Sequence, residues 1–236
     1  MNNATRLQYL EAMGIDVRFT VHQAQTGVVA AVDVDEVPSI KQTVALVEAS
    51  AKAWDVLEKQ VSGCKNCELC HSRTQTVFGA GNNNADWMFV GEVPGQSEDL
   101  AGQPFVGQAG KLLTEMIQAI GLTRESVYIA NILKCRPPND RAPKVEEIHA
   151  CSHYLQQQIA LVKPKIILAV GRVAAQTLLK TNEPLSKLRG VSHQLTDIPL
   201  VVIYHPAYLL RFLPEKRQAW QDLQLANTIY QKIKTL

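Results

Sequence analysis

The segment DWMFVGE, residues 86–92, contains four large apolar residues in a row between an aspartate and a glycine. Three later segments have the same character: VYIANIL (127–133), KIILAVG (165–171) and PLVVIYH (199–205). Short apolar runs bounded by turn residues predict β-strands, and a run without polar alternation indicates a strand that is buried on both faces. The four segments therefore predict the strands of a central sheet.

Helical patterns separate or follow these predicted strands. They cover residues 108–121, 144–162, 172–180 and 216–233. Alternation of strands and helices favours a parallel sheet with helices on both faces. We expect an α/β fold, a three-layer α/β/α sandwich around a mainly parallel four-stranded sheet, over residues 51–236. Residues 1–50 are predicted to form a small N-terminal appendage and linker.

Polar and special-geometry residues collect where the predicted strands end. These stretches read GEVPGQSED (91–99), NILKCRPPNDR (131–141) and HPAYLLR (205–211). In an open parallel sheet the ligand crevice lies outside the carboxyl ends of the strands. The candidates for chemistry there are two carboxylates, an amide and an imidazole: Glu92, Glu98, Asn131 and His205.

Composition excludes several classes of protein. The chain has 236 residues, of which 46% are hydrophobic and 19% charged, as in an ordinary globular protein. No segment approaches the ~20 apolar residues that span a bilayer, so we predict no membrane partner and a cytoplasmic location. The net charge is +2, and the positive excess lies after residue 60, in the part with the motifs. This excess is compatible with a partner that carries phosphates, and equally with a solvated surface of mixed charge.

Three of the five cysteines lie at three-residue intervals in GCKNCELCHSR, residues 63–73. They are Cys64, Cys67 and Cys70. In a reducing compartment, clustered thiols more often bind metal or do redox chemistry than form structural disulfides. Spacing alone does not choose between an iron–sulfur cluster and zinc, because four thiolates suit either.

Four ordered motifs give the sequence a family resemblance: GEVPGQSED, GQPFVGQAG, NILKCRPPNDRAP and YHPAYLLR. With these motifs the chain, over residues 54–229, resembles the family 4 uracil-DNA glycosylases, the iron–sulfur type within the uracil-DNA glycosylase superfamily. The resemblance implies a DNA repair enzyme that flips uracil out of DNA and hydrolyses its N-glycosidic bond. One departure is Val93, which stands next to the pocket where the family usually has glycine or alanine.

The resemblance also implies a cofactor. Members of the family hold a 4Fe–4S cluster on four cysteines, and the matching positions here are Cys64, Cys67, Cys135 and Cys151. Cys70 matches no ligand. The cluster is then expected to be structural, pinning the loop after residue 135 to the segment before residue 64, with zinc as the alternative.

Roles in the pocket follow from the same resemblance. Phe105 matches the residue that stacks on the base, and Asn131 matches the amide that reads its edge. His205 matches the hydrogen-bond partner of uracil O2, and the backbone around Val93 is expected to bind a ring oxygen. For the carboxylate beside the sugar, Glu92 is favoured, with Glu98 in support; the alternative for Glu98 is a turn or helix-terminus ligand.

DNA contacts are expected from loops at the same edge. Leu209 and Leu210, with Tyr208, are candidates for a wedge that fills the vacated stack, each leucine with a core contact as its alternative. Phosphate contacts are predicted for Arg211 and Arg136, and for Lys134 and Arg141 in the same loop as Arg136. The expected partner is uracil-containing DNA, double- or single-stranded, bound by a monomer.

The sequence of residues 1–50 gives the weakest indication of a function. A replication or repair protein is considered as their partner, beside the alternative of a linker without one. Two other functions stay open: a noncatalytic nucleic-acid-binding protein with a structural metal, and a protein that traps uracil-DNA covalently through a histidine such as His193 or His205. A basic, histidine-containing loop of the kind found in a related covalent group is not evident in the sequence.

Overall fold

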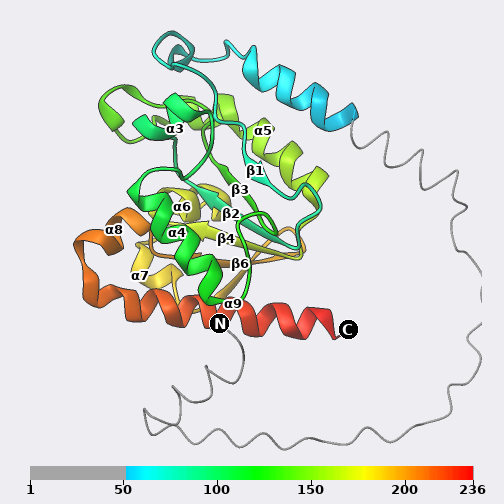
Figure 1. The fold of residues 1–236 in the computed structure, drawn as a ribbon, viewed down its shortest axis with the longest axis vertical. Helices are drawn as coiled ribbons and strands as arrows, with labels where there is room; N and C mark the ends of the chain where they lie inside the picture. The colour runs from blue at the N-terminus through cyan, green and yellow to red at the C-terminus, as the bar shows by residue number, and fades with distance from the viewer. Residues whose placement is uncertain (1–51, 236) are drawn as a thin grey trace, which may run out of the picture. The chain divides into compact units, whose positions relative to one another are not determined.

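The computed structural model describes residues 52–235, and the predicted appendage, residues 1–50, lies outside them. At the centre of the described part is a six-stranded sheet in the order β1-β3-β2-β4-β6-β5 (Figure 1). Its strands are β1 (Ala80–Gly81), β2 (Trp87–Gly91), β3 (Tyr128–Asn131), β4 (Ile166–Val170), β5 (Ser192–Leu195) and β6 (Ile198–Ile203). The α/β class is confirmed.

The four predicted strands are the four central ones, and they are parallel to one another. The sheet differs from the four-stranded prediction at its edges. There β1 pairs antiparallel with β3, and β5 pairs antiparallel with β6. Neither edge strand has an apolar run, because β1 has only two residues and β5 alternates between exposed and partly buried side chains.

Strand register brings the predicted functional stretches together. Gly91 at the end of β2 pairs with Asn131 at the end of β3. Val170 at the end of β4 pairs with Ile203 at the end of β6. Because all four strands run in one direction, the residues that follow them share one edge of the sheet.

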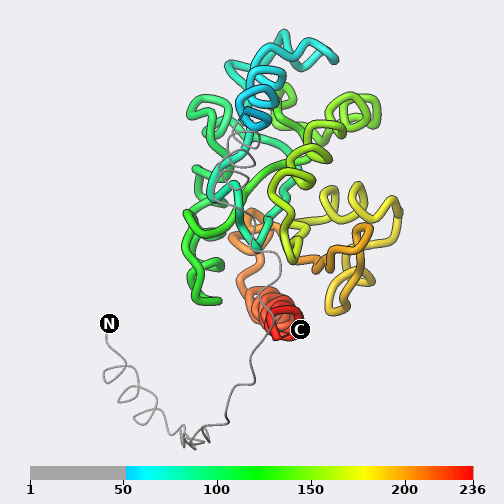
Figure 2. The backbone as a smooth tube through the Cα atoms, turned by 90° about the vertical axis from the view of Figure 1, so that its right-hand side faces the viewer, coloured from blue at the N-terminus to red at the C-terminus, as the bar shows by residue number. Residues whose placement is uncertain are grey.

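Helices cover both faces of the sheet, each above its own apolar core. On one face lie a helix over residues 52–62, α5 (Val145–Val162), α6 (Arg172–Leu179) and α7 (Leu185–Leu188). On the other lie α4 (Gln108–Ala119), α8 (Pro206–Arg211) and α9 (Lys216–Lys234). Figure 2 shows α4 and the α6–α7 pair on opposite sides of the sheet. The three-layer arrangement is therefore present.

Four short helical elements complete the described fold. They are η1 (Glu68–His71), α3 (Gln96–Ala101), η2 (Pro138–Asp140) and η3 (Leu213–Glu215). The helix over residues 52–62 lies beside α5 (Figure 2), and Tyr154 of α5 donates a hydrogen bond to the carbonyl of Gln60 at 3.4 Å. Within the described residues no helix is both long and apolar enough to cross a membrane.

Candidate active site

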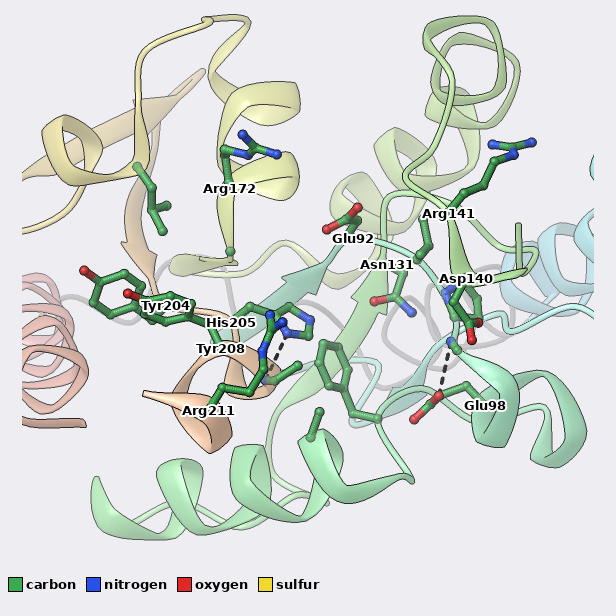
Figure 3. A pocket seen from close by; sticks show the side chains of 18 of the residues that line it. Glu92, Glu98, Asn131, Asp140, Arg141, Arg172, Tyr204, His205, Tyr208 and Arg211 are labelled. Carbon is green, nitrogen blue, oxygen red and sulfur yellow. Dashed lines mark hydrogen bonds between the residues drawn. The ribbon is translucent and has the colours of Figure 1, made fainter. Parts of the chain in front are cut away.

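A cavity of about 790 Å³ opens at the carboxyl edge of the sheet. It is lined by every residue predicted for catalysis or base binding: Glu92, Val93, Glu98, Phe105, Asn131 and His205. Figure 3 shows Asn131 and His205 reaching toward a shared space from the ends of different strands, with Glu92 nearby. The structure thus gathers six side chains that are spread over more than a hundred residues of sequence.

The side-chain amide of Asn131 is buried in the wall of the cavity. The residue is 2% exposed, and its Oδ1 has no hydrogen-bond partner within residues 52–235. A Cβ atom on Gly91 would lie 2.3 Å from this oxygen and 2.5 Å from the ring of Phe105, so only glycine fits there. Buried polar atoms are normally paired, and an unpaired one inside a cavity indicates a ligand that completes it.

The Phe105 ring is held in place by its backbone. Its φ of 53° lies in the left-handed region, which a bulky residue seldom occupies without support. Support comes from Glu98, whose Oε1 accepts hydrogen bonds from the backbone amides of Val106 at 2.9 Å and Gly107 at 3.0 Å. The ring centroid lies 5.8 Å from that of His205. Phe105 is therefore fixed as one wall of the cavity.

Glu98 has less freedom than its predicted catalytic role requires. Besides the two amides after Phe105, its Oε2 accepts from the amide of Gly95 at 3.2 Å, at the start of α3. Three backbone donors satisfy most of the carboxylate's hydrogen-bonding capacity. The structure thus favours a positioning role, with Glu98 as the turn ligand considered in the sequence.

His205 is the second residue after β6 and the N-cap of α8. Its Nδ1 accepts a hydrogen bond from the backbone amide of Ala207 at 3.2 Å, which in the neutral ring leaves the proton on Nε2. Burial lowers the pKa of His205 to about 4, with an opposing effect from the charge of Glu98. At neutral pH the ring is therefore an uncharged Nε2–H donor inside the cavity.

This pKa predicts a pH-dependent stability. The unfolded chain takes up the proton near pH 6.5 and the folded protein only near pH 4. Stabilisation by the neutral ring is therefore complete above pH 6.5 and is lost as the pH falls. Between pH 7 and pH 4 the wild type should lose roughly 3 kcal/mol of unfolding free energy that His205→Asn, which can still cap the helix, does not lose. Urea unfolding of both proteins at both pH values measures this, and parallel losses would contradict it.

Glu92 is the carboxylate that remains available. It follows β2 directly, lines the cavity, and its side chain has no hydrogen-bond partner within the described part of the chain. Burial raises the pKa of Glu92, and the nearby charge of Arg172 lowers it. Arg172 follows Gly171 at the start of α6 and also lines the cavity. A partly buried carboxylate with a raised pKa beside a cation suits a group that takes part in proton transfer.

Comparison with known proteins fits this geometry. A family model described as the uracil DNA glycosylase superfamily matches residues 78–224. A type-4 uracil-DNA glycosylase of Archaeoglobus fulgidus is 42% identical over 72% of this chain and 89% of that protein. One of Sulfurisphaera tokodaii is 48% identical over 71% and 81%, and one of Thermotoga maritima is 39% identical over 75% and 95%. The chain belongs to the type-4 uracil-DNA glycosylase family. The predicted resemblance is thereby confirmed.

In this member of the type-4 family, the predicted DNA contacts divide into two groups. Leu210 is 43% exposed and Arg211 lines the cavity, so both can reach a ligand. Leu209 is 1% exposed and packs in the core beneath α8, so its prediction as a DNA contact was wrong. Consecutive residues of a helix project in different directions, and the sequence stretch alone does not show which of them faces the core.

The cationic side chains around residues 134–141 also separate. Arg136 is ion-paired with Asp140 at 2.7 Å on the surface. Arg141 pairs with the carboxylate of Glu147 at 2.5 Å and lines the cavity. Lys134 is buried, so the prediction that it grips the DNA backbone was wrong.

Sequence reasoning missed an aromatic stack beside the cavity. Tyr204 stacks on Tyr208 with ring centroids 4.9 Å apart, and Tyr208 stacks on Phe212 at 4.6 Å. The guanidinium of Arg189 covers the other end, 3.8 Å from the Tyr204 centroid, and is itself held by Asp222 at 2.6 Å. The spacing of four residues between the aromatic side chains is the signal that could have revealed it.

The four predicted cysteine ligands belong to one region of the type-4 fold. Cys135 and Cys151 are buried, and Cys64 and Cys67 pack partly buried against the same apolar core. Arg73 donates to the Cys135 sulfur at 3.1 Å, and the backbone amide of Lys134 points to the Cys151 sulfur at 3.3 Å. Donors aimed at sulfur stabilise thiolate, the form that binds metal. The residues therefore fit a thiolate-bound group.

Within residues 52–235 no three His, Cys, Asp or Glu side chains converge closely enough to hold a single metal ion.

Proposed function

We propose that this protein removes uracil from DNA by hydrolysing the bond between N1 of the base and C1′ of the deoxyribose, leaving an abasic site and free uracil. The observation that carries the proposal is the cavity in which a buried, unpaired amide oxygen, a neutral imidazole and an aromatic wall meet. Membership of the type-4 uracil-DNA glycosylase family points to the same reaction.

Base recognition is assigned to Asn131 and Phe105. One side-chain amide offers a donor and an acceptor, which pair with O4 and N3–H of uracil. Cytosine presents the inverse pattern, an amino donor and an acceptor nitrogen. A cytosine in the cavity would therefore leave buried polar groups unpaired, which is a strong basis for rejection. The base stacks on the Phe105 ring, and Val93 contributes to the wall beside it.

Bond cleavage separates two charges. As the N1–C1′ bond breaks, its electron pair leaves with the base and the sugar becomes cationic. His205 donates its Nε2 proton as a hydrogen bond to uracil O2 and stabilises the anion. Glu92 stabilises the cation and accepts a proton from the water whose oxygen forms the new bond to C1′. Glu98 acts indirectly, because it holds the loop that carries Phe105.

The same proposal includes a 4Fe–4S cluster on Cys64, Cys67, Cys135 and Cys151. When bound, the cluster supplies a covalent cross-link between four distant points of the chain rather than chemistry on the base. The chain's own contribution is the set of donors around the sulfurs, from Arg73 and from the amide of Lys134. These donors stabilise the ligands as thiolates and connect the centre to β3.

DNA is proposed to bind along α8 and the aromatic stack. Leu210 enters the space vacated by the flipped nucleotide, and Arg211 contacts a neighbouring phosphate. Phe212, at the end of the stack, is 49% exposed and offers a face to an adjacent base. These three residues are consecutive, so one helix terminus places a wedge, a cation and an aromatic ring beside the cavity.

The wedge makes a prediction about duplex DNA. Leu210→Ala should slow excision of uracil from a duplex about tenfold, because the vacated stack is then unfilled at a cost of about 1–2 kcal/mol. Excision from a single strand should change less than about threefold, since no base pair has to open. Single-turnover rates on both substrates measure this, with Leu213→Ala, another exposed leucine nearby, as the control. Equal effects on both substrates would contradict the wedge.

A single assay tests the function itself. The protein is incubated with an oligonucleotide that contains one uracil, and the products are separated before and after treatment with alkali. The proposal predicts free uracil and alkali-dependent strand cleavage at that position, with none at a cytosine in the same context. Intact DNA would indicate the noncatalytic alternative, and an alkali-stable protein–DNA adduct the covalent one; either result would overturn the proposal.

A further inference from the structure

Lys134 is a buried lysine without an acidic partner. It is 1% exposed, and within the described residues no carboxylate forms an ion pair with it. Its Nζ donates to the backbone carbonyl of Asn131 at 2.9 Å and to Oε1 of Gln158 at 2.6 Å. Both acceptors are neutral. A buried ammonium normally requires a compensating negative charge. The two neutral acceptors do not supply that charge, so it has to come from another group.

The backbone of Lys134 connects it to the cysteine centre. Its amide points to the Cys151 sulfur at 3.3 Å, and the next residue is Cys135. Burial lowers the pKa of Lys134 to about 8, and negative charge on these two sulfurs opposes that decrease. As metal ligands both sulfurs are thiolates, and they then supply the negative charge that the two neutral acceptors lack.

A second connection runs through α5. Gln158 lies seven residues after Cys151 on the same helix, and its Nε2 donates to the hydroxyl of Tyr128 at 3.0 Å and to the carbonyl of Phe78 at 2.9 Å. Each hydrogen bond in this network is buried or nearly so. The cysteine centre, Lys134 and the backbone of Asn131 therefore form one continuous polar unit beneath the cavity.

We propose that Lys134 is a positioning residue that ties the base-reading Asn131 to the cysteine centre, with its ammonium as the counter-charge of the ligand thiolates. The inference rests on the proposed function, which assigns base recognition to Asn131. Lys134 therefore has two effects. It retains the metal in the centre, and it fixes the strand end from which the Asn131 amide enters the cavity.

The test compares Lys134→Met, which keeps the packing volume but removes the charge, with Lys232→Met on the exposed end of α9. Both proteins are first checked for folding by circular dichroism. We expect Lys134→Met to release iron to a chelator at least about fivefold faster and to excise uracil about tenfold more slowly in single turnover, the range for losing a hydrogen bond from a charged group. Affinity for uracil-free DNA should stay within about twofold, because no DNA contact is removed. Lys232→Met should match the wild type in all three.

An unchanged rate of iron release or an unchanged excision rate in folded Lys134→Met overturns the proposal. A loss of affinity for uracil-free DNA as large as the loss of excision rate also overturns it. If Lys134→Met does not fold, Gln158→Leu decides, because it removes one acceptor and keeps the ammonium. That variant should show both effects at about threefold, and the absence of either overturns the link. A wild type that releases no uracil would instead remove the proposed function, and iron release alone would then decide whether Lys134 serves the cysteine centre.

Discussion

Replacing His205 with alanine is expected to slow uracil release about 100- to 1,000-fold, the effect of removing one donor from a developing anion in a dry site. The reason is the geometry around the ring. Its Nδ1 is occupied by the Ala207 amide, and its lowered pKa of about 4 keeps it neutral, so Nε2–H is the donor that the cavity presents. Alanine provides no donor, and a water in its place is not held in position.

Single-turnover rates measure this effect because they isolate the chemical step from product release. The matched control is His193→Ala in β5, whose Nε2 lies 2.7 Å from the Leu188 carbonyl and which does not line the cavity. The control should keep the wild-type rate. Between pH 5.5 and 8 the wild-type rate should also show no titration of His205, since its pKa lies below that range. A loss of less than about tenfold in His205→Ala would remove the imidazole from the mechanism.

Replacing Cys135 with serine is expected to have the largest effect on stability. Cys135 is buried, its sulfur accepts a hydrogen bond from Arg73, and its neighbour Lys134 contacts Cys151. Serine cannot replace a thiolate ligand of iron. Loss of the group then removes a cross-link between the segment before β1 and the sheet, and it leaves the partly buried Arg73 guanidinium without its partner. We expect the variant to lack iron and to lose more than about 4 kcal/mol of unfolding free energy.

Three measurements test the loss of iron and of stability. They are iron content, urea unfolding, and the absorbance near roughly 400 nm that is expected of a thiolate-bound cluster. The control is Cys70→Ser, because Cys70 lies in the same short segment as the predicted ligands Cys64 and Cys67 but is assigned no ligand role. It should retain iron and wild-type stability. A colourless wild type with one stoichiometric zinc ion would contradict the cluster, and equal iron loss in both variants would contradict the choice of ligands.

The central fold could be predicted because the burial of its four parallel strands is evident from their apolar sequences. Each of the four parallel strands is fully apolar over most of its length, as a strand covered on both faces must be. The edge strands could not be found in this way. A pair such as Ala80–Gly81 has no periodicity, and β5 reads SHQL, with only one large apolar residue. Their pairing depends on the neighbouring strand rather than on their own composition.

The positions of the polar candidates were predictable, because residues that follow parallel strands share one edge of the sheet, and Asn131 and His205 both line the cavity there. Phe105, which only the family resemblance indicated, lines the cavity from the loop between α3 and α4. Orientation was not predictable. Leu209 and Leu210 are identical in type and adjacent, yet one lies in the core and the other is exposed. Lys134 reads as a surface cation beside a basic loop, and only the packing of α5 over β3 shows that it is buried.

The most direct test of the account is a crystal structure of the protein with a duplex that contains a 2′-fluorinated deoxyuridine, whose glycosidic bond is resistant to cleavage. We predict the uracil flipped into the cavity, with the Asn131 amide on O4 and N3–H, His205 Nε2 on O2, and the ring against Phe105. A uracil that stays stacked in the duplex, or one that binds away from these three side chains, would contradict the account.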